Sequence, residues 1–186
     1  MTVKEIIKNT AFSAGREDVV KYLDGNTTSK GEDTLPTVNL LTGLLNLVIS
    51  ELAGTFIPMI KQERVQTSDG KIFYADLSER AVKIIGVYSE NGNDIDFIKT
   101  AEFIKVNPGT VIVDYEYIPP NYGIDDTIGY TEKEVTSSVL SFGLSAEYAI
   151  SLGDFDQAVM WHKRYVDAIS ELRKIKNVKI KNRSFV

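Results

Sequence analysis

Residues 107–120, Asn-Pro-Gly-Thr-Val-Ile-Val-Asp-Tyr-Glu-Tyr-Ile-Pro-Pro, are the stretch from which the fold can be worked out. From Thr110 to Ile118, β-branched and aromatic residues alternate with polar ones, which is typical of a half-buried β-strand. Asn107-Pro108-Gly109 predicts a turn before this strand. Pro119-Pro120 ends the strand, because proline cannot donate a hydrogen bond to a neighbouring strand. The stretch therefore predicts the last strand of a β region.

The chain before this strand, from Phe56 onward, also has the pattern of short strands. Lys61 to Gln66 and Lys71 to Tyr74 flank Ser68-Asp69-Gly70, which predicts a β-hairpin. Three further strands are expected around a turn at Asn91-Gly92-Asn93-Asp94, at residues 81–88, 95–98 and 103–106. Residues 56–120 are therefore predicted to form an inserted antiparallel β module.

The N-terminal 55 residues have helical periodicity. Thr2 is the expected N-cap of a first helix, residues 16–23 form a second, and the polar run 25–33 is expected to be a loop. Residues 37–53 form the most apolar helix, which Gly54 ends. Its predicted buried face contains residues 41, 44, 45, 48 and 52, widened by residues 40, 47 and 49.

Helical periodicity returns after the β module. Thr131 and Glu134 have the spacing of a capping box and predict a helix start. Gly153-Asp154 predicts a break, and Asp154 with Gln157 starts a last helix, so the two helices form an antiparallel pair. The predicted apolar face of the last helix contains Phe155, Ala158, Val159, Tyr165, Val166, Ile169 and Leu172. The predicted fold is α+β, with a helical body (1–55 and 128–175), the β module (56–120) and an extended C-terminal arm (176–186).

Composition excludes several classes of protein. The chain has no cysteine and one histidine, so disulfides, thiol catalysis and a zinc site are not expected. No run of about 18 consecutive apolar residues occurs, so we expect no membrane span. The net charge is −5, but residues 162–186 contribute +6 and the rest of the chain −11. An acidic body favours protein partners over specific binding of DNA.

No catalytic pattern stands out. His162 lies within the last predicted helix, without a Gly-x-Ser-x-Gly nucleophile motif elsewhere, and a packing or surface role is favoured. Asn91 to Asp96 has calcium-ligand residue types but lacks the glutamate that closes an EF-hand loop, so a turn is favoured. Neither glycine-rich phosphate motif is present. We expect no enzyme activity, no metal and no cofactor.

The last eleven residues are the candidate site. They combine a basic excess, the alternation Val178-Lys179-Ile180-Lys181 and an apolar end, without a later strand in the chain to pair with. Such a segment is either a frayed terminus or an arm that adds to another chain. We expect an arm whose interface residues are Lys176, Val178, Lys179, Ile180, Lys181, Arg183, Phe185 and Val186.

Two segments together resemble the head–tail connector (adaptor, neck) proteins of tailed bacteriophages. The first is the strand 111–120 with its Tyr-x-x-Pro end. The second is the helix segment 140–149, whose small residues precede Tyr148, followed by residues 153–161 with Gly-Asp and Ala-x-x-Trp. The match spans about residues 105–175, and its motifs are structural rather than catalytic. The β module is larger than in the smallest adaptors of the group.

The resemblance implies a virion protein assembled in the host cytoplasm. It implies a ring of identical subunits, commonly twelve, that binds the portal protein and a downstream neck or tail protein. DNA would pass through its channel without specific binding. Two alternatives remain: a tail-completion or tail-terminator protein, and a non-viral monomeric binding module.

Overall fold

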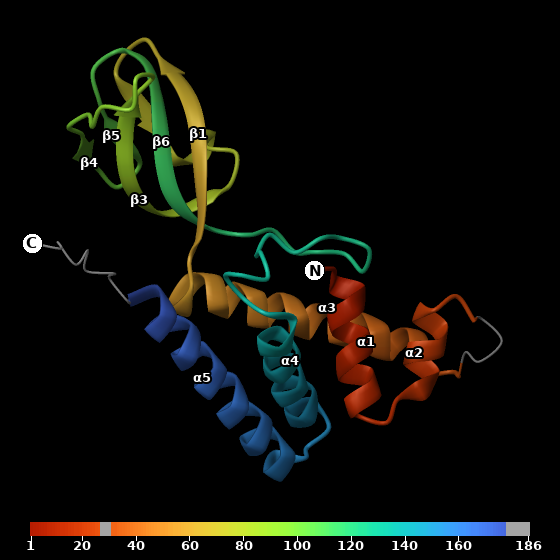
Figure 1. Cartoon of the computed structure of the whole chain (residues 1–186). Helices are drawn as coiled ribbons and strands as arrows, with labels where there is room; N and C mark the ends of the chain where they lie inside the picture. Colours follow the sequence, from red (N-terminus) through yellow and green to blue (C-terminus); the bar gives the residue numbers. More distant parts are fainter. Residues whose placement is uncertain (27–30, 178–186) are drawn as a thin grey trace, which may run out of the picture. The chain divides into compact units, whose positions relative to one another are not determined.

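The chain has an α+β fold (Figure 1). The computed structural model describes residues 1–26 and 31–177, with side chains described as far as Leu172. The described chain divides into two compact units. The first, the helical unit, contains residues 1–48 and the chain from Tyr122 onward, and the second, the β unit, is Ile49–Asn121. The predicted β module began at residue 56 and ended at residue 120, whereas the β unit also takes in the end of a helix.

The helical unit starts with α1 (Val3–Ser13) and α2 (Glu17–Leu23). The predicted N-cap of α1 is confirmed, because Glu5 N–H donates to Thr2 Oγ1 at 3.3 Å. The Glu5 carboxylate accepts from Thr2 N–H in return, at 2.7 Å. This capping box satisfies two amides that the first turn of a helix leaves without partners.

Helix α3 (Thr34–Glu51) is longer than predicted and passes into the π-helical turn η2 (Leu52–Phe56). Its buried face contains Leu41, Leu45 and Val48, as predicted. Leu44, also predicted on this face, is half-buried, and two residues were placed wrongly: Leu40 and Leu47 are exposed. They lie about 100–120° around the helix from Leu41, beyond the face that the helix buries within its own chain.

Helices α4 (Ser137–Ser151) and α5 (Phe155–Asn177) run in opposite directions side by side (Figure 1). The predicted break is confirmed, since Gly153 has φ 75° and Gln157 N–H donates to Asp154 Oδ1 at 3.2 Å. The predicted helix start at Thr131 was wrong. Thr131 and Glu134 do bond to each other, but in a turn, because Thr136 is extended (ψ 154°) and interrupts the helical path.

Three helices of this unit meet at Gly143 in α4. A Cβ atom added there would lie 2.7 Å from Val48 Cγ1 of α3 and 3.0 Å from Tyr165 Cε2 of α5. Such distances are shorter than van der Waals contact, so only glycine allows the three helices to pack this closely. This position fixes the spacing of α4 relative to both neighbours.

The β unit contains two three-stranded antiparallel sheets. One has the order β1-β6-β3 and the other β2-β5-β4. The strands are β1 (Met59–Thr67), β2 (Lys71–Phe73), β3 (Arg80–Ser89), β4 (Ile98–Lys99), β5 (Phe103–Lys105) and β6 (Gly109–Ile118). The strand quoted at the outset is β6, the central strand of its sheet.

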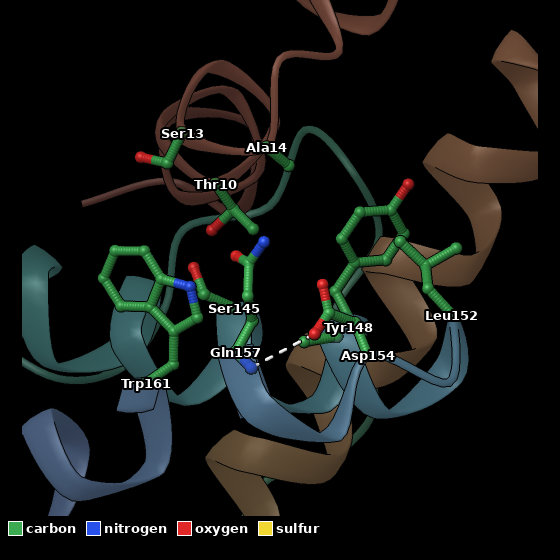
Figure 2. A pocket seen from close by; sticks show the side chains of 10 residues that line it. Thr10, Ser13, Ala14, Ser145, Tyr148, Leu152, Asp154, Gln157 and Trp161 are labelled. Carbon is green, nitrogen blue, oxygen red and sulfur yellow. Dashed lines mark hydrogen bonds between the residues drawn. The ribbon is translucent and has the colours of Figure 1, made fainter. Parts of the chain in front are cut away.

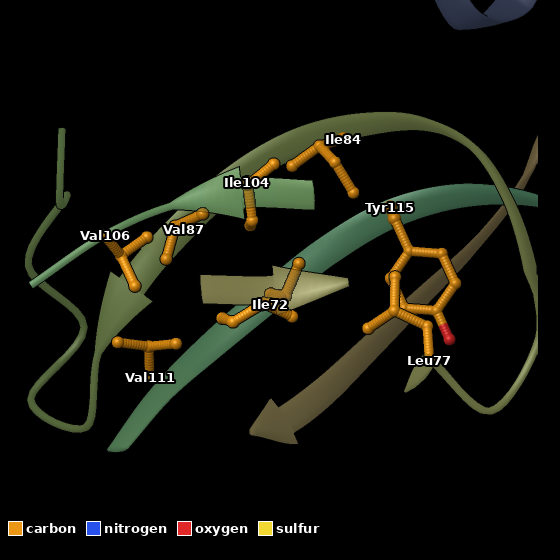
Figure 3. Packing of buried hydrophobic residues seen from close by; sticks show 9 residues of the cluster. Ile72, Leu77, Ile84, Val87, Ile104, Val106, Val111 and Tyr115 are labelled. Atoms are coloured by element: carbon orange, nitrogen blue, oxygen red, sulfur yellow. The ribbon is translucent and has the colours of Figure 1, made fainter. Parts of the chain in front are cut away.

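The predicted hairpin between residues 61–66 and 71–74 was wrong. β1 pairs along its whole length with β6, whereas β2 pairs with β5 in the other sheet. The turn between them therefore connects two sheets, and Thr67 Oγ1 donates across it to the carbonyl of Lys71 at 2.9 Å. The two sheets enclose a core in which Ile72, Ile104 and Tyr115 face one another (Figure 3).

Candidate functional site

The predicted C-terminal arm falls almost entirely outside the described residues. Val178, Lys179, Ile180, Lys181, Arg183, Phe185 and Val186 all lie beyond residue 177. The predicted start of the arm was wrong by two residues: helix α5 continues through Asn177, so Lys176 belongs to the helix. The role of the arm stays a prediction.

The described residues contain no group of three or more His, Asp or Glu side chains that could hold a metal ion. His162 is an exposed residue of α5 whose ring lies 6.3 Å from that of Tyr165. Asn91 to Asp94 form a turn, in which Gly92 has φ 80° and its N–H donates to the Ser89 carbonyl at 2.9 Å. The absence of an enzyme activity stays a prediction.

One small pocket lies between α1, α4 and α5 (Figure 2). Its volume is about 100 Å³, and Thr10 and Ser145 line it next to Gln157 and Trp161. The Thr10 hydroxyl is buried without a hydrogen-bond partner. A space of this size holds a few water molecules, each occupying about 30 Å³ in the liquid. We find no pairing of a nucleophile with a base among these side chains.

A second polar group joins three helices of the helical unit. Arg16 donates two hydrogen bonds to the Asp18 carboxylate, both 2.9 Å, and one to Tyr148 Oη at 3.3 Å. Thr34 Oγ1 at the start of α3 donates to the same carboxylate at 2.9 Å. The hydrogen bonds from the Arg16 guanidinium, and to a lesser extent the one from Thr34, hold the pKa of Asp18 well below its usual range. The arrangement fixes the helices to one another and leaves no free reactive group.

Outside the pocket and the Arg16–Asp18 network, α5 has an exposed apolar surface. Ala158, Tyr165 and Ile169 are buried, but Phe155 and Val159 are 68% and 70% exposed, and Val166 is 40% exposed. At 100° per residue, the exposed positions lie about 80° around α5 from the buried ones. We call Phe155, Val159, His162 and Val166 the α5 stripe.

Helix α3 presents a second exposed apolar surface. Leu40 is 42% and Leu47 56% exposed, with exposed Gly43 between them. Pro36 continues the row, and from Thr34 to Ser50 the helix contains no charged residue. We call Pro36, Leu40, Gly43 and Leu47 the α3 stripe. Helices that face water normally have charged residues on that side.

The apolar character of α3 also bears on membranes. Thr34–Phe56 is long and apolar enough to span a bilayer, judged by length and composition alone, and 39% of its most apolar window is buried within the protein. Buried helices of water-soluble proteins meet the same criterion. We therefore treat lipid as an alternative occupant of the α3 stripe, to be tested by experiment.

Sequence analysis named five apolar residues of the two stripes but placed them wrongly. Phe155, Val159 and Val166 were assigned to the same buried face as Tyr165, and Leu40 and Leu47 to the buried face of α3. The signal that could have separated them is the width of the apolar arc. On each helix this arc spans more of the circumference than one neighbouring helix can cover.

Comparison with known proteins adds no relative. A scan against protein-family models and a search of curated proteins both find no match to this chain.

Proposed function

We propose that this protein is a structural subunit of an oligomeric ring, the head–tail connector (adaptor or neck) of a tailed bacteriophage. In this proposal it assembles between the portal protein and a downstream neck or tail protein, around the channel through which DNA passes. The observation that carries the proposal is the exposed apolar surface of α3 and α5, two long helices of the same unit. Surfaces of this kind on a folded domain mark sites of protein association.

The remaining features agree with a structural role. The pocket between α1, α4 and α5 is small, and Arg16, Asp18 and Thr34 bond to each other in a network that holds helices together. The segments that resemble the connector proteins are β6, α4 and the start of α5. These elements determine packing, since β6 is the central strand of its sheet and α4 contains Gly143.

The acidic balance of the chain fits a channel lining. The whole chain has a net charge of −5. A surface of the same sign as the DNA phosphates repels them at close range and lets a duplex move without being held. Specific partners would then be proteins, and the portal is the first of them.

The proposal is tested by assembly with the portal. The purified full chain is mixed with the portal ring encoded by the same genome, and the complex is observed by negative-stain microscopy. We expect a closed ring of this chain stacked on one face of the portal. A control is the Arg164→Ala variant, which changes an exposed residue of α5 on the side opposite the α5 stripe and should bind the portal as the wild-type chain does. Failure of the wild-type chain to bind the portal would refute the connector role.

A further inference from the structure

The α3 stripe and the α5 stripe have the same spacing. Each places its four residues at positions i, i+4, i+7 and i+11, from Pro36 to Leu47 and from Phe155 to Val166. At 1.5 Å per residue, both stripes are about 16 Å long. Two helices pack when rows of this kind interdigitate, so each stripe has the length and pitch that the other requires.

Nothing in the described part of the chain explains the glycine at position 43, at the centre of the α3 stripe. It lies in the interior of an α-helix, where glycine is unfavourable relative to alanine. A Cβ atom added at this position would meet no atom within 4 Å, so internal packing does not require glycine. A helix that approaches from outside does require it, because the missing side chain lets the two backbones come close.

The charges near the two stripes favour one orientation. Glu32 and Asp33 precede α3, and residues 31–48 include no basic residue. By sequence, α5 has its own excess of basic residues toward its C-terminal end, with Arg173, Lys174 and Lys176 in the last turns. An antiparallel arrangement brings the basic end of α5 to the acidic start of α3, and it also opposes the two helix dipoles favourably.

We propose that the α5 stripe of one copy packs antiparallel against the α3 stripe of a second copy, with Val159 opposite Gly43. In this register Phe155 lies opposite Leu47 and Val166 opposite Pro36. The two stripes are different surfaces, so each copy has one of each and the contact runs head to tail. A head-to-tail contact closes into a ring when its rotation allows. The inference rests on the proposed function and names the subunit contact of that ring.

The stripes form the centre of this contact rather than all of it. A stable interface buries roughly 800 Å² on each partner, more than two helix rows of about 16 Å provide. Exposed side chains beside the rows, such as Lys163 next to the α5 stripe and Asn39 next to the α3 stripe, would form the rim. Tightly packed central residues contribute most of the binding energy, so substitutions there are the sharpest test.

Introduced cysteines test the register. The chain has no cysteine of its own, so each variant contains a single thiol. Protein with Val159→Cys is mixed at high concentration with protein with Gly43→Cys, and a short thiol-to-thiol crosslinker is added. We expect a covalent dimer that needs both variants. The control replaces Val159→Cys with Arg164→Cys, at an exposed position on the other side of α5, and should give at least tenfold less dimer. Equal yields from the two pairs would overturn the proposal.

Two charged variants test the head-to-tail geometry. Val159→Glu disrupts only the α5 stripe and Leu47→Lys only the α3 stripe, and both positions are exposed, so folding is retained. Each variant alone should be a monomer by native mass spectrometry. A mixture should give a dimer of one copy each and nothing larger, since every dimer has one intact contact and two disrupted ends. A ring from either variant alone, or a mixture that stays monomeric, would contradict the proposal.

Three further outcomes separate the alternatives. If wild-type protein co-sediments with phosphatidylcholine–phosphatidylglycerol vesicles, Leu47→Lys abolishes this binding and no crosslink forms, lipid is the occupant of α3 and the proposal is wrong. A ring on the portal without the Val159–Gly43 crosslink refutes this contact and leaves the connector role intact. A crosslinked ring that does not bind the portal refutes the connector role and leaves the contact intact.

Discussion

Replacing Gly143 with alanine places a methyl group where α3, α4 and α5 meet. The new Cβ would lie 2.7 Å from Val48 Cγ1 and 3.0 Å from Tyr165 Cε2, so at least one helix must move. Overpacking of a closely packed core costs about 1–3 kcal/mol. Alanine also gains about 1 kcal/mol of helix propensity over glycine. We therefore expect Gly143→Ala to range from neutral to about 2 kcal/mol destabilising.

Gly43→Ala is the matched control, because it makes the same chemical change within an α-helix. Its Cβ would have no neighbour within 4 Å, so only the propensity gain of about 1 kcal/mol remains. The two variants should therefore differ by about 1–3 kcal/mol, although both replace a helical glycine with alanine. The difference isolates the packing of three helices from propensity.

The assay is urea denaturation followed by far-ultraviolet circular dichroism, at a concentration at which both variants are monomeric. Gly43→Ala should unfold at higher urea than wild type, and Gly143→Ala at the same or lower urea, with unchanged slopes. In thermal melts, 1 kcal/mol corresponds to roughly 2–4 °C for a chain of this size. Equal stabilisation by both substitutions would refute the packing of α3 and α5 against Gly143.

Three further predictions concern single features of the two units. Desolvation raises the pKa of Glu63, but hydrogen bonds from Ser78 and Tyr115 outweigh it and hold this pKa below 4.5. The ionised Glu63 therefore contributes its full stabilisation of the folded state above about pH 4.5, and this contribution is lost as the pH falls. Glu63→Gln should cost about 1–2 kcal/mol of stability at pH 7 and flatten the acid side of the stability–pH curve. Asp18→Asn should destabilise the helical unit at pH 7 by about 1–3 kcal/mol, with the difference from wild type shrinking below pH 4, and a constant difference would contradict the ionic role of Asp18. Deletion of residues 178–186 should leave the melting temperature unchanged but weaken portal docking, and unchanged docking at several salt concentrations would dismiss the arm.

Sequence analysis predicted the positions of the strands and helices better than it predicted which strands pair with one another. β6 was predicted almost to its ends, because alternation from Thr110 to Ile118 and the prolines after it are local signals. The pairing of β1 with β6 rather than β2 was missed, since a turn such as Ser68-Asp69-Gly70 looks the same in a hairpin and between two sheets. Strand pairing depends on which core the inward side chains share, and this is a tertiary property.

The candidate surfaces were missed for a related reason. The sequence of α5 shows a wide apolar arc, but it does not show that only the part with Ala158 and Tyr165 is buried. Phe155 and Val159 therefore appeared as core residues. The same holds for Leu40 and Leu47 of α3. Periodicity indicates which residues avoid water, whereas only the structure shows which of them still face it.

Native mass spectrometry of the full chain, alone and with the portal ring of the same genome, tests the central claim most directly. We predict one closed assembly of a single copy number, which the Val159→Glu and Leu47→Lys substitutions each prevent. A chain that stays monomeric at every concentration and with the portal present would contradict the account.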